Sequence, residues 1–124
     1  MQNKKNILIF YPYNRIAIDQ ISVIELLYKK HNIFFLTIDH IGPFHKIISE
    51  MNIINYSVKD SYNKNKMKFF NTRFFFYLHM LNEFKKIISK HKIDVVFSHL
   101  EIPGLISGMF SFYYKYKNYY FRHN

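Results

Sequence analysis

The sequence predicts an α/β fold: a Rossmann-like open parallel sheet of about five strands, with helices on both faces. Short, continuous apolar runs suit strands that are covered on both faces. They alternate with segments in which apolar residues recur every three or four positions, as they do in amphipathic helices. This alternation favours a parallel sheet with right-handed crossovers, because each helix returns the chain to the start of the next strand.

The first half of the chain supplies three expected strands: Ile7–Tyr11, Ile33–Ile38 and Ile53–Val58. A helix is predicted between the first two strands, over about residues 16–30, and a shorter one between the last two, over about 44–51. The apolar face predicted for the first helix consists of Ile18, Ile21, Ile24, Leu27 and Tyr28.

The second half begins with a polar, basic stretch over residues 59–68, which is expected to be a loop. A long helix is predicted over about residues 71–90, followed by a strand at Asp94–Ser98. The next helix starts near Pro103, since proline is tolerated in a first helical turn, and a last strand covers Asn118–Arg122. The inward face predicted for the long helix consists of Phe74, Tyr77, Leu78, Leu81, Phe84, Ile87 and Ile88.

A chain of 124 residues suits one domain, and residues 1–124 show no repeat or linker. The last predicted strand lacks the covering helix that usually follows in a doubly wound fold. The chain has no cysteine, so a disulfide framework and a thiolate zinc site are excluded. It shows no signal-peptide pattern and no apolar stretch long enough to span a bilayer. We expect a cytoplasmic protein, or one that lies peripherally at the inner face of the membrane.

The chain is strongly basic, with 18 Lys and Arg against 8 Asp and Glu. The excess is lopsided: residues 1–62 carry a net charge of +2 and residues 63–124 a net charge of +8. A basic field favours anionic partners such as nucleic acid, an acidic membrane or a phosphorylated substrate. The chain is also rich in residues with A/T-rich codons, so base composition could account for much of the excess.

Polar side chains follow the predicted strands where open parallel sheets bind their ligands, at the carboxyl ends. His99 and Glu101 follow the fourth strand, and His123 and Asn124 follow the fifth. Glu101 could orient the His99 imidazole, or each could be an ordinary capping or structural residue. His123 could act on a developing charge or simply be a terminal residue.

The other strand exits carry weaker signals. Arg15 follows the first strand near a helix start and could bind an anion, or could be a solvated surface residue. Asp39 follows the second strand, where nucleotide-binding folds hold a ribose, but it also suits a turn. The chain has no dinucleotide fingerprint, P-loop or G-x-S-x-G elbow, so we expect no cofactor and no hydrolase triad. Four histidines lack zinc-site spacing and are expected on polar helix faces or helix ends, so no metal is expected. These are His31, His45, His79 and His91.

Basic and aromatic side chains alternate between residues 64 and 77. The basic members are Lys64, Lys66, Lys68 and Arg73. Such a segment can stack on bases or lie at a membrane surface. It can also be a core-packing helix with a solvated basic edge. The phenylalanines exceed one helical face, which favours an interaction surface for an anionic partner.

The order of these pieces resembles the N-terminal half of GT-B glycosyltransferases, the retaining family-4 kind that use nucleotide sugars. The likeness rests on the first strand Ile7–Tyr11, on Glu25–Ile33 with its basic turn, on Lys92–His99, and on Phe121–Asn124. It covers nearly the whole chain. One departure is that the usual glycine pair after the first strand is missing, so Asn14 and Arg15 are assigned to the acceptor.

The resemblance implies an acceptor-binding domain whose C-terminal, donor-binding partner domain is absent. His123 would be the catalytic residue that approaches the transferred sugar. The acceptor side would be lined by Asn14, Arg15, His99, Glu101 and Asn124. The acceptor would be a glycan or a lipid-linked sugar, with the nucleotide-sugar donor held by the missing domain. We expect no appreciable transfer by the chain alone, because nothing in it would stabilise the leaving diphosphate.

Two other functions remain open. The chain could be a stand-alone flavodoxin-like binding module that docks on nucleic acid or an anionic membrane through residues 64–73, with nucleic acid the less expected partner. It could also be a structural or regulatory subunit that pairs with a catalytic protein through an open sheet edge.

Overall fold

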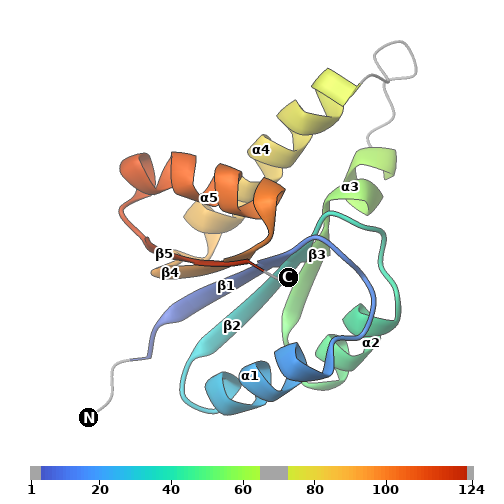
Figure 1. The fold of residues 1–124 in the computed structure, drawn as a ribbon, viewed down its shortest axis with the longest axis vertical. Coiled ribbons are helices and arrows are strands. Elements are labelled where there is room, and N and C mark those ends of the chain that lie inside the picture. Colours follow the sequence, from blue (N-terminus) through green and yellow to red (C-terminus); the bar gives the residue numbers. More distant parts are fainter. Residues whose placement is uncertain (1–3, 65–72, 123–124) are drawn as a thin grey trace.

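The computed structural model describes residues 4–64 and 73–122, and it confirms the predicted fold class. Strands and helices alternate along the chain as the hydrophobic pattern indicated (Figure 1). The elements are β1 (Asn6–Tyr11), α1 (Ile18–Tyr28), β2 (Asn32–Thr37), α2 (Pro43–Glu50), β3 (Ile54–Ser57), α3 (Val58–Lys64), α4 (Arg73–Lys90), β4 (Val95–His99), α5 (Glu101–Tyr114) and β5 (Lys117–Phe121).

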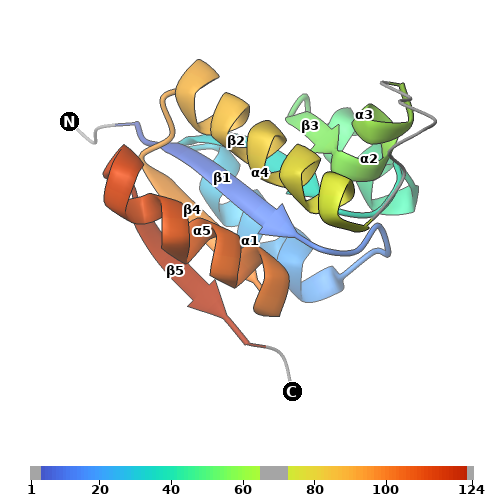
Figure 2. The same cartoon turned by 90° about the horizontal axis from the view of Figure 1, so that it is seen from above.

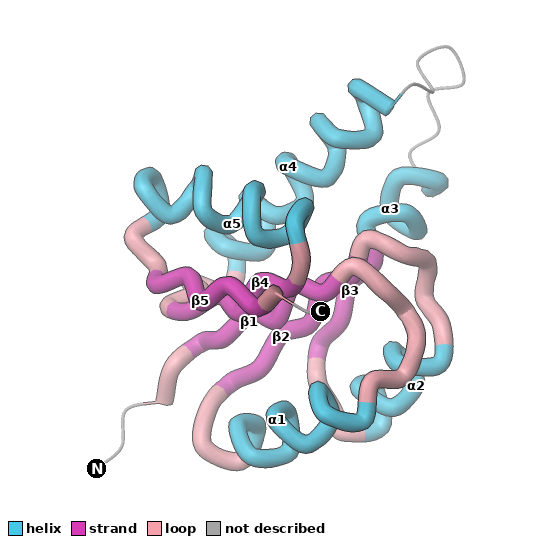
Figure 3. The backbone as a smooth tube through the Cα atoms, in the orientation of Figure 1, coloured by secondary structure: helices cyan, strands magenta, loops and turns pink. Residues whose placement is uncertain are grey.

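The five strands form one parallel sheet in the order β3-β2-β1-β4-β5. The strands make a single central layer with helices on either side (Figure 3). β1 lies at the centre, where Ile7 pairs with Ile33 of β2 and with Val95 of β4. The Asp94 carboxylate fixes the start of this pairing by accepting a hydrogen bond from the Asn6 N–H at 2.9 Å. β4 and β5 are neighbours, as the sequence predicted, with His99 opposite Phe121.

The alternation of side chains along each strand builds a separate core on each face of the sheet. α1 and α2 cover one face, where Ile24 and Ile48 pack against Ile9 and Phe35. α4 and α5 cover the other face and enclose Leu8, Phe10, Leu36 and Val96 together with Phe84 and Ile106 of the helices. The two helix layers lie above and below the sheet in Figure 1, and Figure 2 shows α4 and α5 on the near side.

The buried face of α1 differs from the prediction. Ile24 is fully buried, but Ile18 is 80% exposed, and Gln20 is buried instead. The prediction was wrong at Ile18 because the helix begins there and its first turn lies beyond the apolar core. Periodicity identifies an apolar stripe, but it does not show how far the stripe extends over the sheet.

The predicted inward face of α4 is only half correct. Phe84, Ile87 and Ile88 are buried as expected, together with Met80. The N-terminal half of the helix rises away from the sheet (Figure 1). For this reason Phe74, Tyr77 and Leu78, in the first turns of α4, are exposed, although they were predicted to face inward.

The polar stretch that was predicted to be a loop begins as a helix. α3 covers residues up to Lys64, and the remainder of that stretch lies outside the described residues. Ser57 caps the start of this helix, because its Oγ accepts a hydrogen bond from the Asp60 N–H at 3.2 Å. The spacing Ser57-x-x-Asp60 is itself a helix-start signal that the prediction missed.

Candidate functional site

The centre of the sheet is a topological switch point, where ligands bind in open parallel sheets. β1 and β4 are neighbours, but the chain leaves β1 toward α1 on one face and leaves β4 toward α5 on the other. The two exits diverge and leave a pocket of about 280 Å³ between them. We call this the switch-point pocket; its lining consists of Pro12, Tyr13, Leu100, Glu101, Ile102 and Pro103.

Glu101 and Arg15 are the two predicted site residues that the structure leaves accessible near this pocket. Glu101 lies in the first turn of α5, lines the pocket and is exposed. The Arg15 guanidinium lies 5.1 Å from the centre of the Tyr13 ring, which is a cation–π distance. Glu101 is the single ionisable carboxyl group among the lining residues, and none of them is basic. The pocket therefore suits a ligand that donates hydrogen bonds better than it suits an anion.

His99 has a different environment from Glu101. It is the last residue of β4 and is only 3% exposed. Its ring stacks on Phe121 of β5 at 4.8 Å between ring centres and meets the Tyr11 ring edge-on at 5.5 Å. These aromatic contacts fix the imidazole beneath the exits of β1, β4 and β5. His123 and Asn124, the other predicted residues at this rim, lie outside the described residues.

Asn14 connects two loops. Its Nδ2 donates a hydrogen bond to the His40 carbonyl at 2.9 Å, and its own carbonyl accepts one from the Phe44 N–H. Gly42 lies close beside it, since a Cβ at that position would come within 2.9 Å of the Asn14 amide nitrogen and displace the Asn14 side chain. Asn14 therefore holds the β1–α1 loop against the β2–α2 loop, a positioning role that the sequence did not predict.

The turn from β4 into α5 is strained at Leu100. Its φ of 69° and ψ of −178° fall in a region that glycine adopts readily and other residues rarely do. The strain is held in place because the Leu100 N–H donates to the Phe121 carbonyl and the Leu100 carbonyl accepts from the Gly104 N–H. Strained backbone clusters at functional sites, and this residue lines the switch-point pocket.

We predict that Leu100→Gly is more stable than Leu100→Ala by about 1–2 kcal/mol. Both variants lose the leucine side chain, but only glycine relieves the strained backbone. At most positions in folded segments the glycine variant is less stable than the alanine variant, because glycine costs more conformational entropy on folding. Urea unfolding of the two variants measures the difference. Equal stability, or a more stable alanine variant, would show that the backbone is not strained at Leu100.

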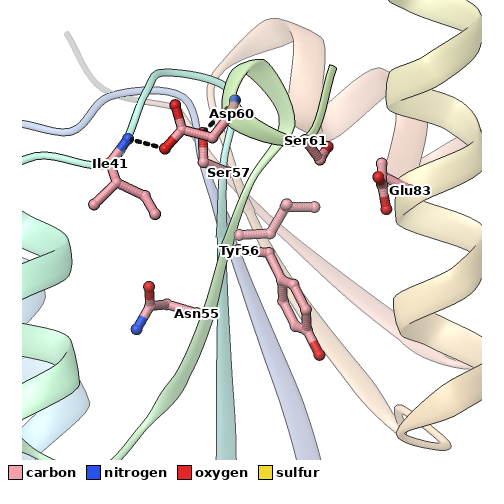
Figure 4. A pocket seen from close by; sticks show the side chains of 8 residues that line it. Ile41, Asn55, Tyr56, Ser57, Asp60, Ser61 and Glu83 are labelled. Atoms are coloured by element: carbon pink, nitrogen blue, oxygen red, sulfur yellow. Dashed lines mark hydrogen bonds between the residues drawn. The ribbon is translucent and has the colours of Figure 1, made fainter. Parts of the chain in front are cut away.

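A second pocket lies at the sheet edge formed by β3 and has a volume of about 160 Å³ (Figure 4). Asp60 of α3 points toward the backbone of Ile41, whose N–H it accepts at 3.1 Å, and its other oxygen accepts from His40 Nδ1 at 2.6 Å. These hydrogen bonds, with the one from His40 the larger cause, lower the pKa of Asp60 below its usual value. Asp39, the predicted ribose candidate, pairs with Lys59 at 3.2 Å. Both carboxylates therefore already have partners within the protein.

Ser61 and Glu83 of this lining both contact His79, but the three side chains do not have the arrangement of a hydrolase triad. His79 Nε2 lies 2.7 Å from Ser61 Oγ and 3.4 Å from Glu83 Oε1. In a triad the acid binds the ring nitrogen that the serine does not use. Here both partners contact the same nitrogen, and the Ser61 hydroxyl donates to the Val58 carbonyl. This geometry supports helix packing between α3 and α4 rather than nucleophilic catalysis.

His45 shows that the predicted placement of the histidines was partly wrong. It was expected on a polar helix face, yet it is 1% exposed. Its Nδ1 accepts the Gly42 N–H at 3.1 Å, so Nε2 carries the proton and contacts Thr37 Oγ1 at 2.7 Å. The Thr37 hydroxyl in turn donates to the Asp39 carbonyl. Protonation of Nδ1 would oppose a backbone N–H, so the neutral ring is the form that fits.

The stability of the protein should fall as the pH drops below about 6.5. Burial lowers the pKa of His45 from its usual 6.5, and the nearby Asp60 and Asp39 carboxylates offset this only in part. The unfolded chain therefore binds a proton before the folded chain does. Stability is fully present above 6.5 and is lost as the pH falls toward the folded pKa, by up to about 1.4 kcal/mol per pH unit.

Urea unfolding between about pH 7.5 and 5.5 measures this slope. His45→Gln is expected to be less stable at the higher pH but to show a shallower decline. Burial also lowers the pKa values of His79 and His91, so part of the slope remains in the variant. Identical slopes in the two proteins would contradict the role assigned to His45.

The predicted anionic-partner residues lie mostly beyond what the structure describes. Lys66 and Lys68 lie outside the described residues, and Lys64 ends α3. Arg73 begins α4 and is exposed. Across residues 4–64 and 73–122, no three His, Asp or Glu side chains are grouped so that they could hold a metal ion. No helix in this part of the chain is long and apolar enough to cross a membrane.

Comparison of the chain with models of known protein families and with curated proteins found no match. The α/β fold with its five parallel strands stands on the sheet topology itself.

Proposed function

We propose that the chain is the acceptor-side domain of a nucleotide-sugar-dependent glycosyltransferase of GT-B type. The observation that carries the proposal is the location of the switch-point pocket. It is formed by the exit of β1 and by the exit of β4, and these two strands belong to the segments on which the family resemblance rests. In such a domain the acceptor binds at the carboxyl end of the sheet and faces a second, donor-binding domain.

The chemistry of the pocket supports a hydroxyl-rich acceptor. Glu101 offers carboxylate oxygens that accept hydrogen bonds, and Tyr13 offers an aromatic face with a polar tip. A glycan presents many O–H donors and little charge, which matches a lining that includes one acid and no base. His99 would act beneath the pocket by fixing the turn that presents Glu101. The roles of His123 as the catalytic residue and of Asn124 as an acceptor-binding residue stay predictions.

The proposal is tested by sugar transfer with the full chain alone and with the chain joined to a GT-B donor-binding domain. Transfer to a glycan or lipid-linked acceptor is expected only when the two are joined, because the leaving diphosphate needs electrostatic stabilisation. Glu101→Gln should weaken acceptor binding by about tenfold or more, since a hydrogen bond to a charged group is lost. Glu25→Gln, at an exposed position of α1, is the matched control and should change nothing. If neither form of the chain binds any such acceptor, the proposal is wrong.

The lopsided positive charge favours a second candidate, a stand-alone flavodoxin-like module that binds an anionic partner, either nucleic acid or a membrane surface. Titration of the full chain with single-stranded and duplex nucleic acid at several salt concentrations separates the two functions. Affinity that falls steeply with salt, with a logarithmic slope of about 0.9 per phosphate contacted on duplex DNA, would favour this candidate. Weak binding without such a slope would leave the glycosyltransferase proposal in place.

A further inference from the structure

The outer surface of α4 and α5 exposes several large apolar side chains. The two helices lie on the same face of the sheet, on the near side in Figure 2. We call their outward side chains the α4–α5 face; its apolar members are Phe74, Leu78, Leu105, Met109, Phe112 and Tyr113. Phe112 is 87% exposed, Tyr113 77% and Leu105 73%. Leu105, Met109, Phe112 and Tyr113 recur every three or four residues along α5 and therefore share its outward side. A shared apolar side of this kind marks an interaction surface.

The charges around this face have one dominant sign. α5 contains no lysine or arginine in its 14 residues, although the chain has 18 of them. Lys85 of α4 is exposed beside Met109 and Tyr113 of α5, and Lys115 is exposed at the end of α5. Glu101 is the exposed acid at the other end of α5, near the switch-point pocket. The face is therefore an apolar centre with a basic border along α4 and at the C-terminal end of α5.

A pocket of about 390 Å³ opens within this face, between the two helices. Its lining joins apolar and aromatic side chains to a single lysine, and the members are Lys85, Met109, Phe110, Tyr113 and Tyr114. An amphiphile with an apolar tail and an anionic head matches this lining, with the head at Lys85.

We propose that the α4–α5 face docks on an anionic lipid bilayer. Exposed aromatic and aliphatic side chains would enter the boundary between headgroups and acyl chains, and the lysines would contact anionic headgroups. Lysine stems can lie along the apolar layer while their ammonium groups reach the charged surface. This differs from the surface expected from the sequence, which centred on residues 64–73. The proposal does not rest on the glycosyltransferase function and would stand without it.

Cosedimentation of the full chain with vesicles tests the proposal. The chain should bind vesicles of phosphatidylcholine containing one third phosphatidylglycerol, and should bind pure phosphatidylcholine vesicles far less. Leu105→Ser should weaken binding about tenfold, because an inserted leucine is lost. Leu26→Ser is a close control, since Leu26 is 74% exposed but lies on α1, across the sheet. Equal weakening by both variants, or equal binding to both kinds of vesicle, would overturn the proposal.

A second pair of variants tests the basic border. Replacing Lys85 and Lys115 by glutamine should weaken binding about fivefold for each lysine lost. Replacing Lys29 and Lys30, which follow α1 on the other side of the sheet, should have a much smaller effect. If both pairs weaken binding equally, the net charge of the chain attracts the vesicles without a defined face, and the proposal fails.

Insertion of the α4–α5 face into the bilayer can be followed by the fluorescence of a single introduced tryptophan, because the chain contains none of its own. Phe112→Trp should shift its fluorescence to shorter wavelength when anionic vesicles are added, and Tyr28→Trp on α1 should not. A shift of Phe112→Trp that depends on protein concentration without vesicles would show that a second copy of the chain covers the face. That result, or no shift with vesicles, would overturn the proposal.

Discussion

Phe84→Ala is expected to lower the free energy of unfolding by about 3–5 kcal/mol. The Phe84 side chain is fully buried and joins three elements. Its ring stacks on Phe10 of β1 at 5.5 Å and on Phe110 of α5 at 5.9 Å, and it meets Tyr116 edge-on. Truncation would leave a cavity under α4 that the neighbouring rings cannot fill. Since small domains are stable by about 5–15 kcal/mol in total, the variant would be close to unfolding.

Urea unfolding followed by circular dichroism measures this loss, and Phe112→Ala serves as its control. Phe112 is also a helical phenylalanine, but it lies in solvent on α5. Its removal should change stability by no more than about 0.5 kcal/mol. If the two variants lose similar free energies of unfolding, the burial of the Phe84 ring is not the cause of the destabilisation.

Asn118→Ala is expected to cost about 2–4 kcal/mol, the second largest effect. The Asn118 Oδ1 accepts hydrogen bonds from Ser98 Oγ at 2.9 Å and from Ser107 Oγ at 2.7 Å. Both serines are fully buried, so alanine at position 118 would leave two buried hydroxyls without this acceptor. The three residues join β4, β5 and α5 immediately beneath the strained Leu100 turn. We therefore expect the switch-point pocket to lose its shape together with this network.

Asn118→Asp keeps an oxygen at the same position and is the matched control. It should retain most of the stability near neutral pH, because a carboxylate can accept both serine hydroxyls. Amide hydrogen exchange of α5 measures the local effect, and urea unfolding measures the global one. If alanine and aspartate at position 118 destabilise the protein equally, the acceptor oxygen is not what holds α5 on the sheet.

The strands could be predicted because their signal is local. Ile7–Tyr11 and the run that starts at Asp94 are continuously apolar, as strands buried on both faces must be. The buried faces of α1 and α4 were harder to predict, since periodicity gives an apolar stripe but not the length of sheet beneath it. Phe74 and Ile18 belong to such stripes and are exposed because their helices extend beyond the sheet.

The position of the candidate site followed from topology, whereas its details did not. The sequence predicted ligand binding at the carboxyl ends of the strands, and the family resemblance put Asn14, Arg15 and Glu101 on one acceptor side. In the structure Glu101 lines a pocket together with Tyr13, which was not predicted. The strain at Leu100 could not be predicted, because it depends on a distant contact. The Leu100 N–H donates to the carbonyl of Phe121, which lies on β5, 21 residues later in the sequence. The positioning role of Asn14 likewise depends on a loop that folds against it.

The central pairing of β1 with β4 has a consequence for how the protein is made. Ile7 aligns with Val95, so the middle of the sheet joins positions separated by most of the chain. Contacts between such distant positions form slowly, because a long loop must close first. A ribosome must therefore deliver the chain as far as β4 before β1 and β4 can pair, and until then this edge of β1 remains open.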